Sequence, residues 1–225
     1  MIEMVAFDVA GTTVTDDGLV IKAFEKAFAL TVPEIWAVKS QDLTKYALDT
    51  MGQSKIEVFT AMLGDANLAE QANRSFEAAY LELVQTEGVS EIQGARLVLE
   101  DLKSRGIKTA LTTGFSRPTI NAIIDSLDWQ GLVQVTVVPG DVGAGRPSPL
   151  MLEAAASFLS VEHASNCVVL GDTVSDMEAA VKFGAGMRVG VLSGAHSSAA
   201  LAAAGAINII DSVASLPNLL FNSRL

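Results

Sequence analysis

Four short polar motifs carry residue types that can act together on a phosphoryl group. A carboxylate can attack phosphorus as a nucleophile when a cation offsets the repulsion between the two anions. Asp8 is the candidate nucleophile, and the carboxylates of Asp172 and Asp176 are hard oxygen ligands that favour Mg²⁺ over softer metals. The motifs are Asp8-Val9-Ala10-Gly11-Thr12, Thr113-Gly114, Gly145-Arg146-Pro147 and Gly171-Asp172-Thr173-Val174-Ser175-Asp176.

Thr113 and Arg146 would neutralise the remaining phosphoryl oxygens, as phosphoryl transfer requires. Each residue also has an ordinary structural explanation. Asp172 or Asp176 alone could cap a helix, and an isolated arginine is most often a surface charge. The combination of all four motifs favours a single site. For one ion to bridge them, we expect the Asp8 side chain to lie within about 8 Å of the 171–176 loop.

Short apolar runs that end in polar residues predict the strands that position these motifs. Continuous apolar runs separated by helix-length segments are typical of parallel strands buried on both faces. Ligands of such sheets bind beyond the carboxyl ends of the strands, where Asp8, Thr113 and Asp172 fall. The predicted strands are 2–7, 107–111, 135–138, 167–170, 187–191 and 207–210, and the intervening helices are 94–105, 117–127, 149–159 and 175–183.

The segment between the first two strands contains apolar residues at helical spacing and no strand-like run. Helices are predicted over residues 19–30, 54–63 and 66–84. Such a segment is too long for one crossover helix, so it predicts an inserted domain over the strand ends. We expect an α/β core of a doubly wound, Rossmann-like parallel sheet over residues 1–14 plus 91–225, with a helical cap domain over 15–90.

Composition limits the classes of partner. The net charge is −11, and the chain has no cluster of Lys and Arg, so binding to nucleic acid or to an anionic membrane is not expected. No apolar run reaches the ~18 residues of a membrane span, and the N-terminus lacks the basic start of a signal peptide. The single cysteine, Cys167, lies in an apolar run, which predicts that its thiol is buried. We therefore expect a cytoplasmic protein.

In order and spacing, the four motifs resemble those of the haloacid dehalogenase superfamily of Mg²⁺-dependent aspartate-nucleophile hydrolases. The resemblance implies that Asp8 forms an aspartyl-phosphate, that Thr113 binds phosphate and that Arg146 is the basic residue of the third motif. It also implies the ligands of Mg²⁺: the Asp8 carboxylate, the Ala10 backbone carbonyl and Asp172, with Asp176 acting directly or through water.

Two departures from the superfamily pattern resemble its phosphonatase (phosphonoacetaldehyde hydrolase-like) branch. Most of its phosphatases have a general-acid Asp where this chain has Ala10, and Lys where it has Arg146. That branch also uses a cap lysine, in the pattern Met-Gly-x-x-Lys, to form a Schiff base with the substrate aldehyde. Lys55 fits that role, and the residues expected to contact substrate are Thr12, Gly114, Met51 and Gly52.

The chemistry of C–P cleavage is consistent with these departures. Breaking the bond leaves a carbanion, and a protonated imine next to that carbon can accept its electrons as an enamine. No leaving oxygen then needs a proton, which agrees with Ala10. The resemblance weakens beside the lysine, where Val58 replaces a histidine of the branch, Phe115 replaces a tyrosine and about Leu19 replaces a cysteine.

The sequence thus favours a Mg²⁺-dependent hydrolase that cleaves the C–P bond of phosphonoacetaldehyde or a related carbonyl phosphonate. A small-molecule phosphatase acting on a phosphate monoester or acyl phosphate is the first alternative, with Lys55 contacting substrate as a cation. A non-catalytic module that binds a phosphorylated metabolite is the second. The oligomeric state stays open, because the apolar helix 19–30 suits either a homodimer through the cap or packing within the core.

Overall fold

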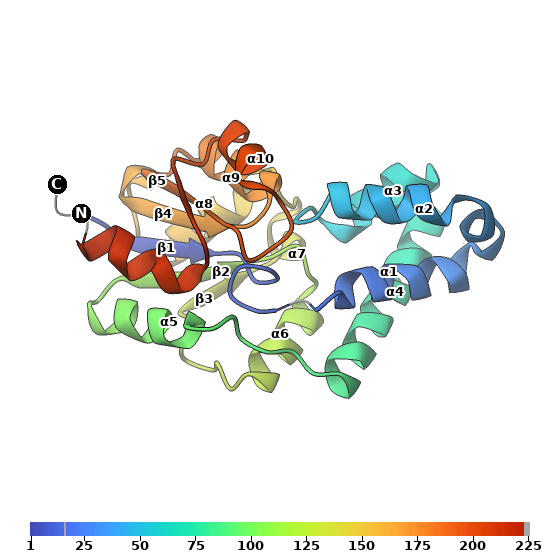
Figure 1. Ribbon diagram of the computed structural model, residues 1–225, viewed down its shortest axis with the longest axis horizontal. Helices are drawn as coiled ribbons and strands as arrows, with labels where there is room; N and C mark the ends of the chain where they lie inside the picture. The colour runs from blue at the N-terminus through green and yellow to red at the C-terminus, as the bar shows by residue number, and fades with distance from the viewer. Residues whose placement is uncertain (16, 223–225) are drawn as a thin grey trace.

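A six-stranded parallel sheet forms the centre of the computed structural model, which describes residues 1–15 and 17–222 (Figure 1). Its strand order is β3-β2-β1-β4-β5-β6, so β1 and β4 lie side by side in the middle. This arrangement confirms the predicted doubly wound α/β fold. The strands are β1 (Met4–Phe7), β2 (Lys108–Thr112), β3 (Val135–Val137), β4 (Cys167–Gly171), β5 (Met187–Val191) and β6 (Asn208–Ile210).

Helices cover both faces of the sheet. Successive side chains of β1 point to opposite faces, and all of them are therefore buried. Val5 and Phe7 pack into one apolar cluster with α5 (Ala95–Ser104) and α6 (Arg117–Ser126). Met4 and Ala6 pack into a second cluster, formed with α8 (Leu150–Phe158) and α9 (Val174–Phe183). The remaining elements of this part are α7 (Pro139–Val142), α10 (Ser198–Ala203), η1 (Ala164–Asn166), η2 (Val213–Ser215) and η3 (Asn218–Asn222).

The register of the central strands brings their carboxyl ends to one edge. Phe7 pairs with Leu111 on β2 and with Leu170 on β4, so the loops that follow these three strands start at the same level. The backbone N–H of Asp8 donates to the carbonyl of Leu170 at 2.9 Å. The loops that carry the first, second and fourth motifs therefore begin side by side.

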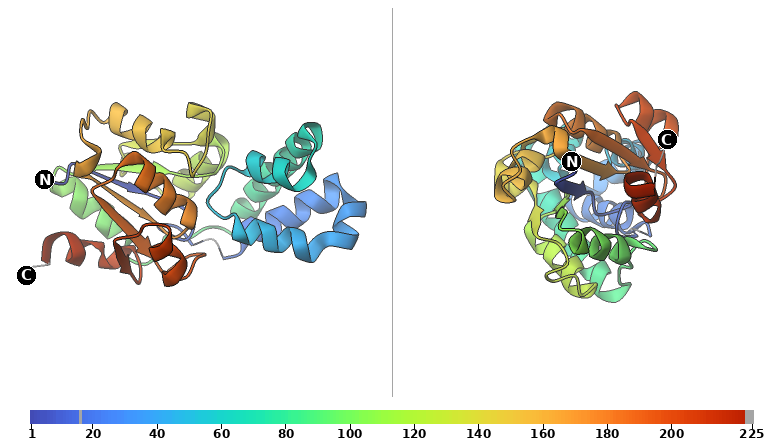
Figure 2. Two further views of the ribbon diagram at one scale, coloured as in Figure 1. Left: turned by 90° about the horizontal axis from the view of Figure 1, so that it is seen from above. Right: turned by 90° about the vertical axis from the view of Figure 1, so that its left-hand side faces the viewer.

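Four helices form a separate layer beyond this edge, on the right of Figure 1 and of the left-hand view in Figure 2. They are α1 (Leu19–Thr31), α2 (Pro33–Asp49), α3 (Lys55–Leu63) and α4 (Ala66–Thr86). Their centre is aromatic, with Phe24 in contact with Phe59 and Phe76 at centroid separations of 4.8 and 4.9 Å. The chain enters and leaves this layer along paired segments, where Thr15 N–H donates to Ser90 and Ile92 N–H donates to Thr13.

The predicted strands and helices are all confirmed to within about two residues, the usual uncertainty of element ends. The helix α2 was not predicted, because only Leu43 and Ala47 of its seventeen residues are buried and no apolar stripe marks it. The short helix α7 was also not predicted. The division into a core over 1–14 plus 91–225 and a cap over 15–90 stays a prediction, and residues 16 and 223–225 of those ranges lie outside the described part of the chain.

Two smaller expectations concern single features. Cys167 is buried on β4, as its apolar surroundings predicted, and burial raises the pKa of its thiol to about 11. Within residues 1–15 and 17–222, every helix is too short or too polar to span a membrane.

Candidate active site

Three buried carboxylates meet at the carboxyl edge of the sheet. Asp8 follows β1, Asp172 follows β4, and Asp176 lies in the first turn of α9. One ligand oxygen from each lies within 4.8 Å of the others, which is shorter than the limit of about 8 Å expected for a shared ion. Their exposed fractions are 5%, 2% and 2%. Adjacent parallel strands thus bring residues from the two ends of the chain into one cluster.

Asp172 is oriented by hydrogen bonds to both of its carboxylate oxygens. The Thr12 hydroxyl donates to Oδ1 at 2.9 Å, and the Ala195 backbone N–H donates to Oδ2 at 2.8 Å. The backbone at Gly11 comes so close that a Cβ there would lie 2.6 Å from Oδ2, and its φ of +84° also favours glycine. The loop after β1 therefore holds Asp172 in a single orientation.

Asp176 is positioned by the start of α9. The Thr173 backbone N–H and hydroxyl both donate to Asp176 Oδ2, at 3.0 and 2.6 Å, while the Asp176 N–H donates back to the Thr173 hydroxyl at 3.2 Å. This is a reciprocal capping box, which also satisfies otherwise unpaired N–H groups of the first helical turn. It leaves Asp176 Oδ1 directed toward the cluster.

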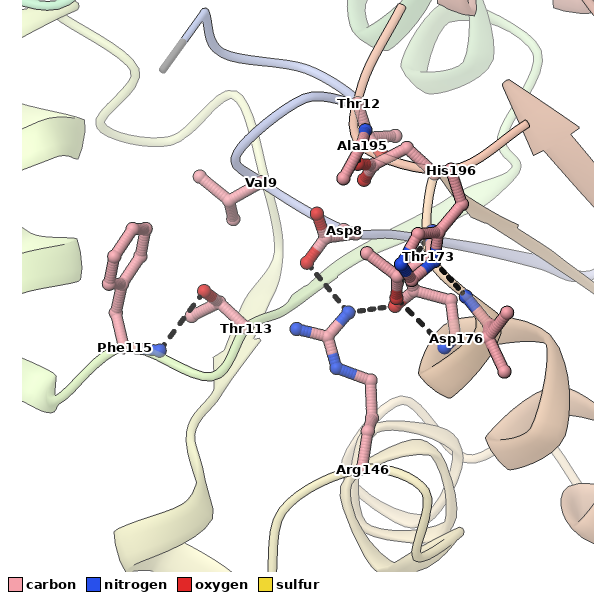
Figure 3. A network of polar contacts seen from close by, with 12 residues as sticks. Asp8, Val9, Thr12, Thr113, Phe115, Arg146, Thr173, Asp176, Ala195 and His196 are labelled. Carbon is pink, nitrogen blue, oxygen red and sulfur yellow. Dashed lines mark hydrogen bonds and ion pairs between the residues drawn. The ribbon is translucent and has the colours of Figure 1, made fainter. Parts of the chain in front are cut away.

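Arg146 lies between Asp8 and Asp176 (Figure 3). Its Nη1 donates to Asp8 Oδ1 at 2.7 Å and also to Asp176 Oδ1, and the side chain is 4% exposed. Its Nε is buried and finds no hydrogen-bond acceptor among residues 1–15 and 17–222. The guanidinium thus offsets part of the negative charge and keeps donor capacity, as a site for an anionic group requires.

The charge of the cluster is not fully balanced by Arg146. Burial, and next the charge of Asp8, raise the pKa of Asp172 to about 7. The hydrogen bonds from Ala195 and Thr12, and then the charge of Arg146, act in the opposite direction. Three carboxylates around one point are the hard oxygen donors that suit a divalent cation such as Mg²⁺. The donor set therefore fits the ion that the sequence predicts.

The second motif forms another wall of the site. Thr113 follows β2 and is 2% exposed, and its Oγ1 accepts a hydrogen bond from the Phe115 backbone N–H at 3.3 Å. A small cavity of about 30 Å³ lies between this loop, the carboxylates and the helical layer. Its lining consists of Asp8, Ala10, Val20, Met51, Gly52, Lys55, Thr113, Gly114, Phe115, Arg146, Asp172 and Thr173.

Lys55 enters this cavity from the helical layer. It is the first residue of α3 and is 6% exposed, and its Nζ lies 5.7 Å from the centroid of the Phe24 ring. The same cavity is lined by Asp8 and Arg146, so an amine from the helices and a carboxylate from the sheet face one small space. The structure therefore brings together residues that the sequence predicted to act on one substrate.

Glycines allow the 51–54 loop to pack directly on the core. Gly52 has a φ of +85°, and a Cβ there would collide with the Thr173 side chain. A Cβ at Gly114 would lie 2.7 Å from the Gln53 carbonyl oxygen, and one at Gly145 would lie 2.7 Å from Ser54 Cβ. No ordinary side chain would fit at these contacts. The close approach is what places Lys55 beside the carboxylates.

Two predicted site residues lie outside the cavity lining. Thr12, for which contact with substrate was predicted, donates its hydroxyl to Asp172. Asp176 contacts Arg146 and Thr173 rather than the cavity. Sequence reasoning missed Thr173 and the Ala195 N–H. The Thr173-x-x-Asp176 spacing is a capping-box pattern that could have indicated the first, but no local pattern marks Ala195.

The residues that replace the histidine and the tyrosine of the phosphonatase branch are apolar and buried. Val58 is 2% exposed and Phe115 is 3% exposed. The Phe115 ring packs against Tyr80 at a centroid separation of 4.7 Å. Phe115 therefore contributes to packing between the helical layer and the core.

Comparisons with known proteins agree with the motifs. Residues 2–184 match the model of a family of haloacid dehalogenase-like hydrolases. A phosphonoacetaldehyde hydrolase of Bacillus cereus strain B4264 is 33% identical over 195 residues, which cover 79% of this chain and 71% of that protein. A second phosphonoacetaldehyde hydrolase of Bacillus cereus is 35% identical over 192 residues, with the same coverage.

Solved structures share the whole architecture. A phosphonoacetaldehyde hydrolase-like protein from Oleispira antarctica has a TM-score of 0.83 and 25% identity, covering 98% of this chain and 92% of that one. A hydrolase from Pseudomonas syringae has a TM-score of 0.84 and 24% identity, covering 100% of both chains. The second likeness, at its lower identity, concerns the fold alone.

Proposed function

The chain belongs to the haloacid dehalogenase-like hydrolases, and we propose that it cleaves the C–P bond of phosphonoacetaldehyde or a related carbonyl phosphonate. The observation that carries this proposal is the single small cavity lined by both Asp8 and Lys55. Asp8 comes from the sheet and would act on the phosphorus, and Lys55 comes from the helical layer and would act on the carbonyl. Relatives at 33–35% identity that are named phosphonoacetaldehyde hydrolase support the same chemistry.

Asp8 acts as the nucleophile toward phosphorus. One of its oxygens forms a bond to the phosphoryl group, while Arg146, whose Nη1 lies 2.7 Å from Asp8 Oδ1, offsets the added negative charge. Thr113 and the N–H groups after it bind the remaining phosphoryl oxygens. Water then hydrolyses the aspartyl-phosphate, which releases inorganic phosphate and restores the carboxylate.

A divalent cation would be held by Asp8, the Ala10 backbone carbonyl and Asp172, with Asp176 bound directly or through water. Mg²⁺ at this position supplies positive charge that lowers the repulsion between the Asp8 carboxylate and an anionic phosphoryl group. Thr12 and Ala195 keep the Asp172 oxygens in place through their hydrogen bonds. We assign Thr12 to this positioning role in preference to substrate contact.

Lys55 supplies the electron sink. Its amine condenses with the substrate carbonyl, releasing water and forming a protonated imine. When the C–P bond breaks, the electron pair moves into the imine as an enamine. Protonation of the enamine carbon and hydrolysis of the imine then release the aldehyde or ketone. Met51 and Gly52 line the same cavity and hold the substrate chain between Lys55 and Asp8.

Ala10 fits this reaction, since cleavage leaves no alkoxide that needs a general acid. Its side chain lines the cavity where a phosphatase would place an aspartate. Val58 and Phe115 offer no proton-transfer group, so a water molecule or the substrate itself must carry the proton. We expect turnover of phosphonoacetaldehyde to be slow for this reason.

The test is phosphate release combined with trapping of the imine. In the presence of Mg²⁺, the protein should release phosphate from phosphonoacetaldehyde or from a 2-oxoalkyl phosphonate. Borohydride should then attach the reduced substrate to Lys55, as seen by peptide mass spectrometry. Lys55→Arg keeps the charge but cannot form the imine, so we expect a loss of phosphonate cleavage of about 100-fold or more. Mg²⁺ binding by calorimetry should stay within about threefold.

Lys45→Arg is the matched control, because Lys45 is exposed on α2 and pairs with Asp49. This variant should retain wild-type activity. Absence of phosphate release from every carbonyl phosphonate, with no borohydride adduct at Lys55, would contradict the proposed C–P cleavage. Equal activity of Lys55→Arg and wild type would contradict the imine step alone.

A small-molecule phosphatase is the alternative that one observation favours. Val58 and Phe115 are both buried and apolar, which removes groups expected beside a Schiff-base lysine. Lys55 would then bind the substrate as a cation, and an acyl phosphate or aryl phosphate, whose leaving group needs no proton, would suit Ala10. Ordinary turnover of such phosphates by Lys55→Arg, with no cleavage of phosphonates by wild type, would support this alternative.

Three other features belong to the proposal. We assign α1–α4 as an inserted cap domain over the site, and the cavity between these helices and the sheet supports that role. We also propose a cytoplasmic location, which cell fractionation would test.

A module that only binds a phosphorylated metabolite would need no nucleophile. If beryllofluoride with Mg²⁺ stabilises the protein against heat, and if Asp8→Asn abolishes this stabilisation, the result would count against such a module.

A further inference from the structure

The loop after β5 has little burial to hold it in place. This segment, residues 192–197, is named the β5 loop and connects β5 to α10. Four of its residues in a row, 192–195, are exposed. Because exposed residues gain little from apolar packing, the conformation of the β5 loop depends on its hydrogen bonds.

His196 makes two of these hydrogen bonds, and both are to the fourth motif (Figure 3). Its backbone N–H donates to the Asp172 carbonyl at 3.2 Å. Its ring Nδ1 accepts a hydrogen bond from the Val174 backbone N–H at 2.8 Å. The two contacts lie on either side of Thr173, so His196 holds the main chain that joins Asp172 to α9.

The Val174 N–H needs such a partner. Val174 is the first residue of α9, and the first N–H groups of a helix have no acceptor within the helix. The capping box satisfies the N–H groups of Thr173 and Asp176. For Val174, the acceptor is the His196 ring, 22 positions away along the chain.

Movement of the β5 loop would be transmitted directly to Asp172. The Ala195 N–H of this loop donates to Asp172 Oδ2 at 2.8 Å. The backbone at Gly194 is also close, since a Cβ there would lie 2.0 Å from the same oxygen. Without the His196 ring, the loop would lose a hydrogen bond next to these contacts, and the donor to Asp172 Oδ2 would be held less firmly.

We infer that His196 is a positioning residue for the proposed Mg²⁺ site, acting through Val174 and the β5 loop on the direction of the Asp172 carboxylate. In a neutral imidazole whose Nδ1 accepts a hydrogen bond, Nε2 carries the proton, so neither nitrogen is free to bind the ion itself. This inference rests on the metal site of the proposed function and not on the cleavage of the C–P bond.

The test compares Mg²⁺ affinity with stability in two variants of His196. Calorimetric titration with Mg²⁺ measures the affinity, and thermal melting with EDTA measures the stability without the ion. His196→Ala removes the acceptor, so we expect the Kd for Mg²⁺ to rise by about tenfold, as is typical when a group that orients a metal ligand is lost.

His196→Asn is the conservative variant, because Oδ1 of asparagine occupies the same place in the side chain as Nδ1 of histidine and can accept the Val174 N–H. Its Kd for Mg²⁺ should stay within about threefold of the wild-type value. His163→Ala is the matched control, since His163 is the other histidine of the chain and is exposed before η1. This control should bind Mg²⁺ as wild type does.

A purely structural role would lower the melting temperature of His196→Ala in EDTA and leave its Kd unchanged, which would overturn the inference. Equal weakening of Mg²⁺ binding in His196→Asn and His196→Ala would also overturn it, because the acceptor would then be irrelevant. Absence of Mg²⁺ binding by wild type would overturn both the inference and the proposed metal site. Mg²⁺ binding that depends on His196, without phosphate release from any carbonyl phosphonate, would support the inference and contradict C–P cleavage.

Discussion

At the residue scale, Arg146 joins the two halves of the carboxylate cluster. Its Nη1 contacts both Asp8 and Asp176. All three side chains are almost completely buried, so water does little to screen their charges. A lysine could place one point charge there but not a planar group with several donors in fixed directions. The arginine of the third motif therefore has a structural as well as a chemical role.

In the absence of a metal ion, replacement of Arg146 by alanine should strongly destabilise the protein. Asp8 and Asp176 would remain buried without their cation, and breaking a buried ion pair from one side costs about 3–5 kcal/mol. We expect the free energy of unfolding, measured by urea titration with EDTA at neutral pH, to fall by about this amount.

Arg74→Ala provides the comparison, because Arg74 pairs with Glu70 on the exposed face of α4. Removal of this surface pair should change the free energy of unfolding by about 1 kcal/mol or less. A loss below about 1 kcal/mol for Arg146→Ala would mean that the cluster tolerates the uncompensated carboxylates, contrary to the charge argument.

At the element scale, the loop between α2 and α3 determines how closely the helical layer approaches the sheet. The contacts between this loop and the core involve three glycines, Gly52, Gly114 and Gly145, so no side chain at these positions keeps the two segments apart. Because α3 begins at Lys55, directly after the loop, the position of the loop sets the position of the amine. Small changes in this loop should therefore affect catalysis more than stability.

Gly52→Ala should reduce activity far more than an equivalent change elsewhere. Both Gly52 and Gly64 have a positive φ, so alanine at either position costs about 1 kcal/mol of backbone strain. Only at Gly52 does the new Cβ collide with Thr173, while the space around Gly64 is open. We expect kcat/KM of Gly52→Ala to fall by about 100-fold, and that of Gly64→Ala by less than about threefold.

Steady-state assays and thermal melting of both variants check this expectation. Comparable melting temperatures with very different kcat/KM values would support the role of the loop. If both variants lost activity equally, backbone strain alone would account for the result, and the contact with Thr173 would have no special importance.

At the scale of the whole molecule, the helical layer has its own apolar core. The face of α1 that contains Phe24 and Phe28 is buried against α3, α4 and Trp36 of α2. Packing within the layer thus accounts for the apolar pattern of this helix. The exposed apolar residues of the layer are elsewhere and include Leu30 and Val38, which are 74% and 81% exposed.

A homodimer through the helical layer stays a prediction with a defined interface. Since the buried face of α1 is already covered, two copies would have to associate through exposed residues such as Leu30 and Val38. If the dimer forms, Val38→Lys should weaken it by about tenfold or more through burial of a charge. Sedimentation velocity of wild type at the mass of one chain, 23.5 kDa, across micromolar concentrations would contradict the dimer.

The sequence by itself determined the fold class and most of the strands and helices. Each buried parallel strand is a short apolar run, and the first, second and fourth motifs follow such runs, so local patterns were sufficient. The separation of Asp8, Asp172 and Asp176 along the chain also carried information, because parallel strands bring their carboxyl ends to one edge. The helix α2, with two buried residues, and the four-residue helix α7 lacked a pattern that could predict them.

Tertiary structure alone decided how the side chains of the site are used. The hydrogen bond from Thr12 to Asp172 and the support from Ala195 depend on loops that are distant in sequence and close in space. The small cavity lined by Lys55 and Asp8 arises where α3 and the loop before it face the loops after β1 and β2. No local pattern encodes these contacts, because periodicity reports which face of an element is buried, and the packing of separate elements determines what that face meets.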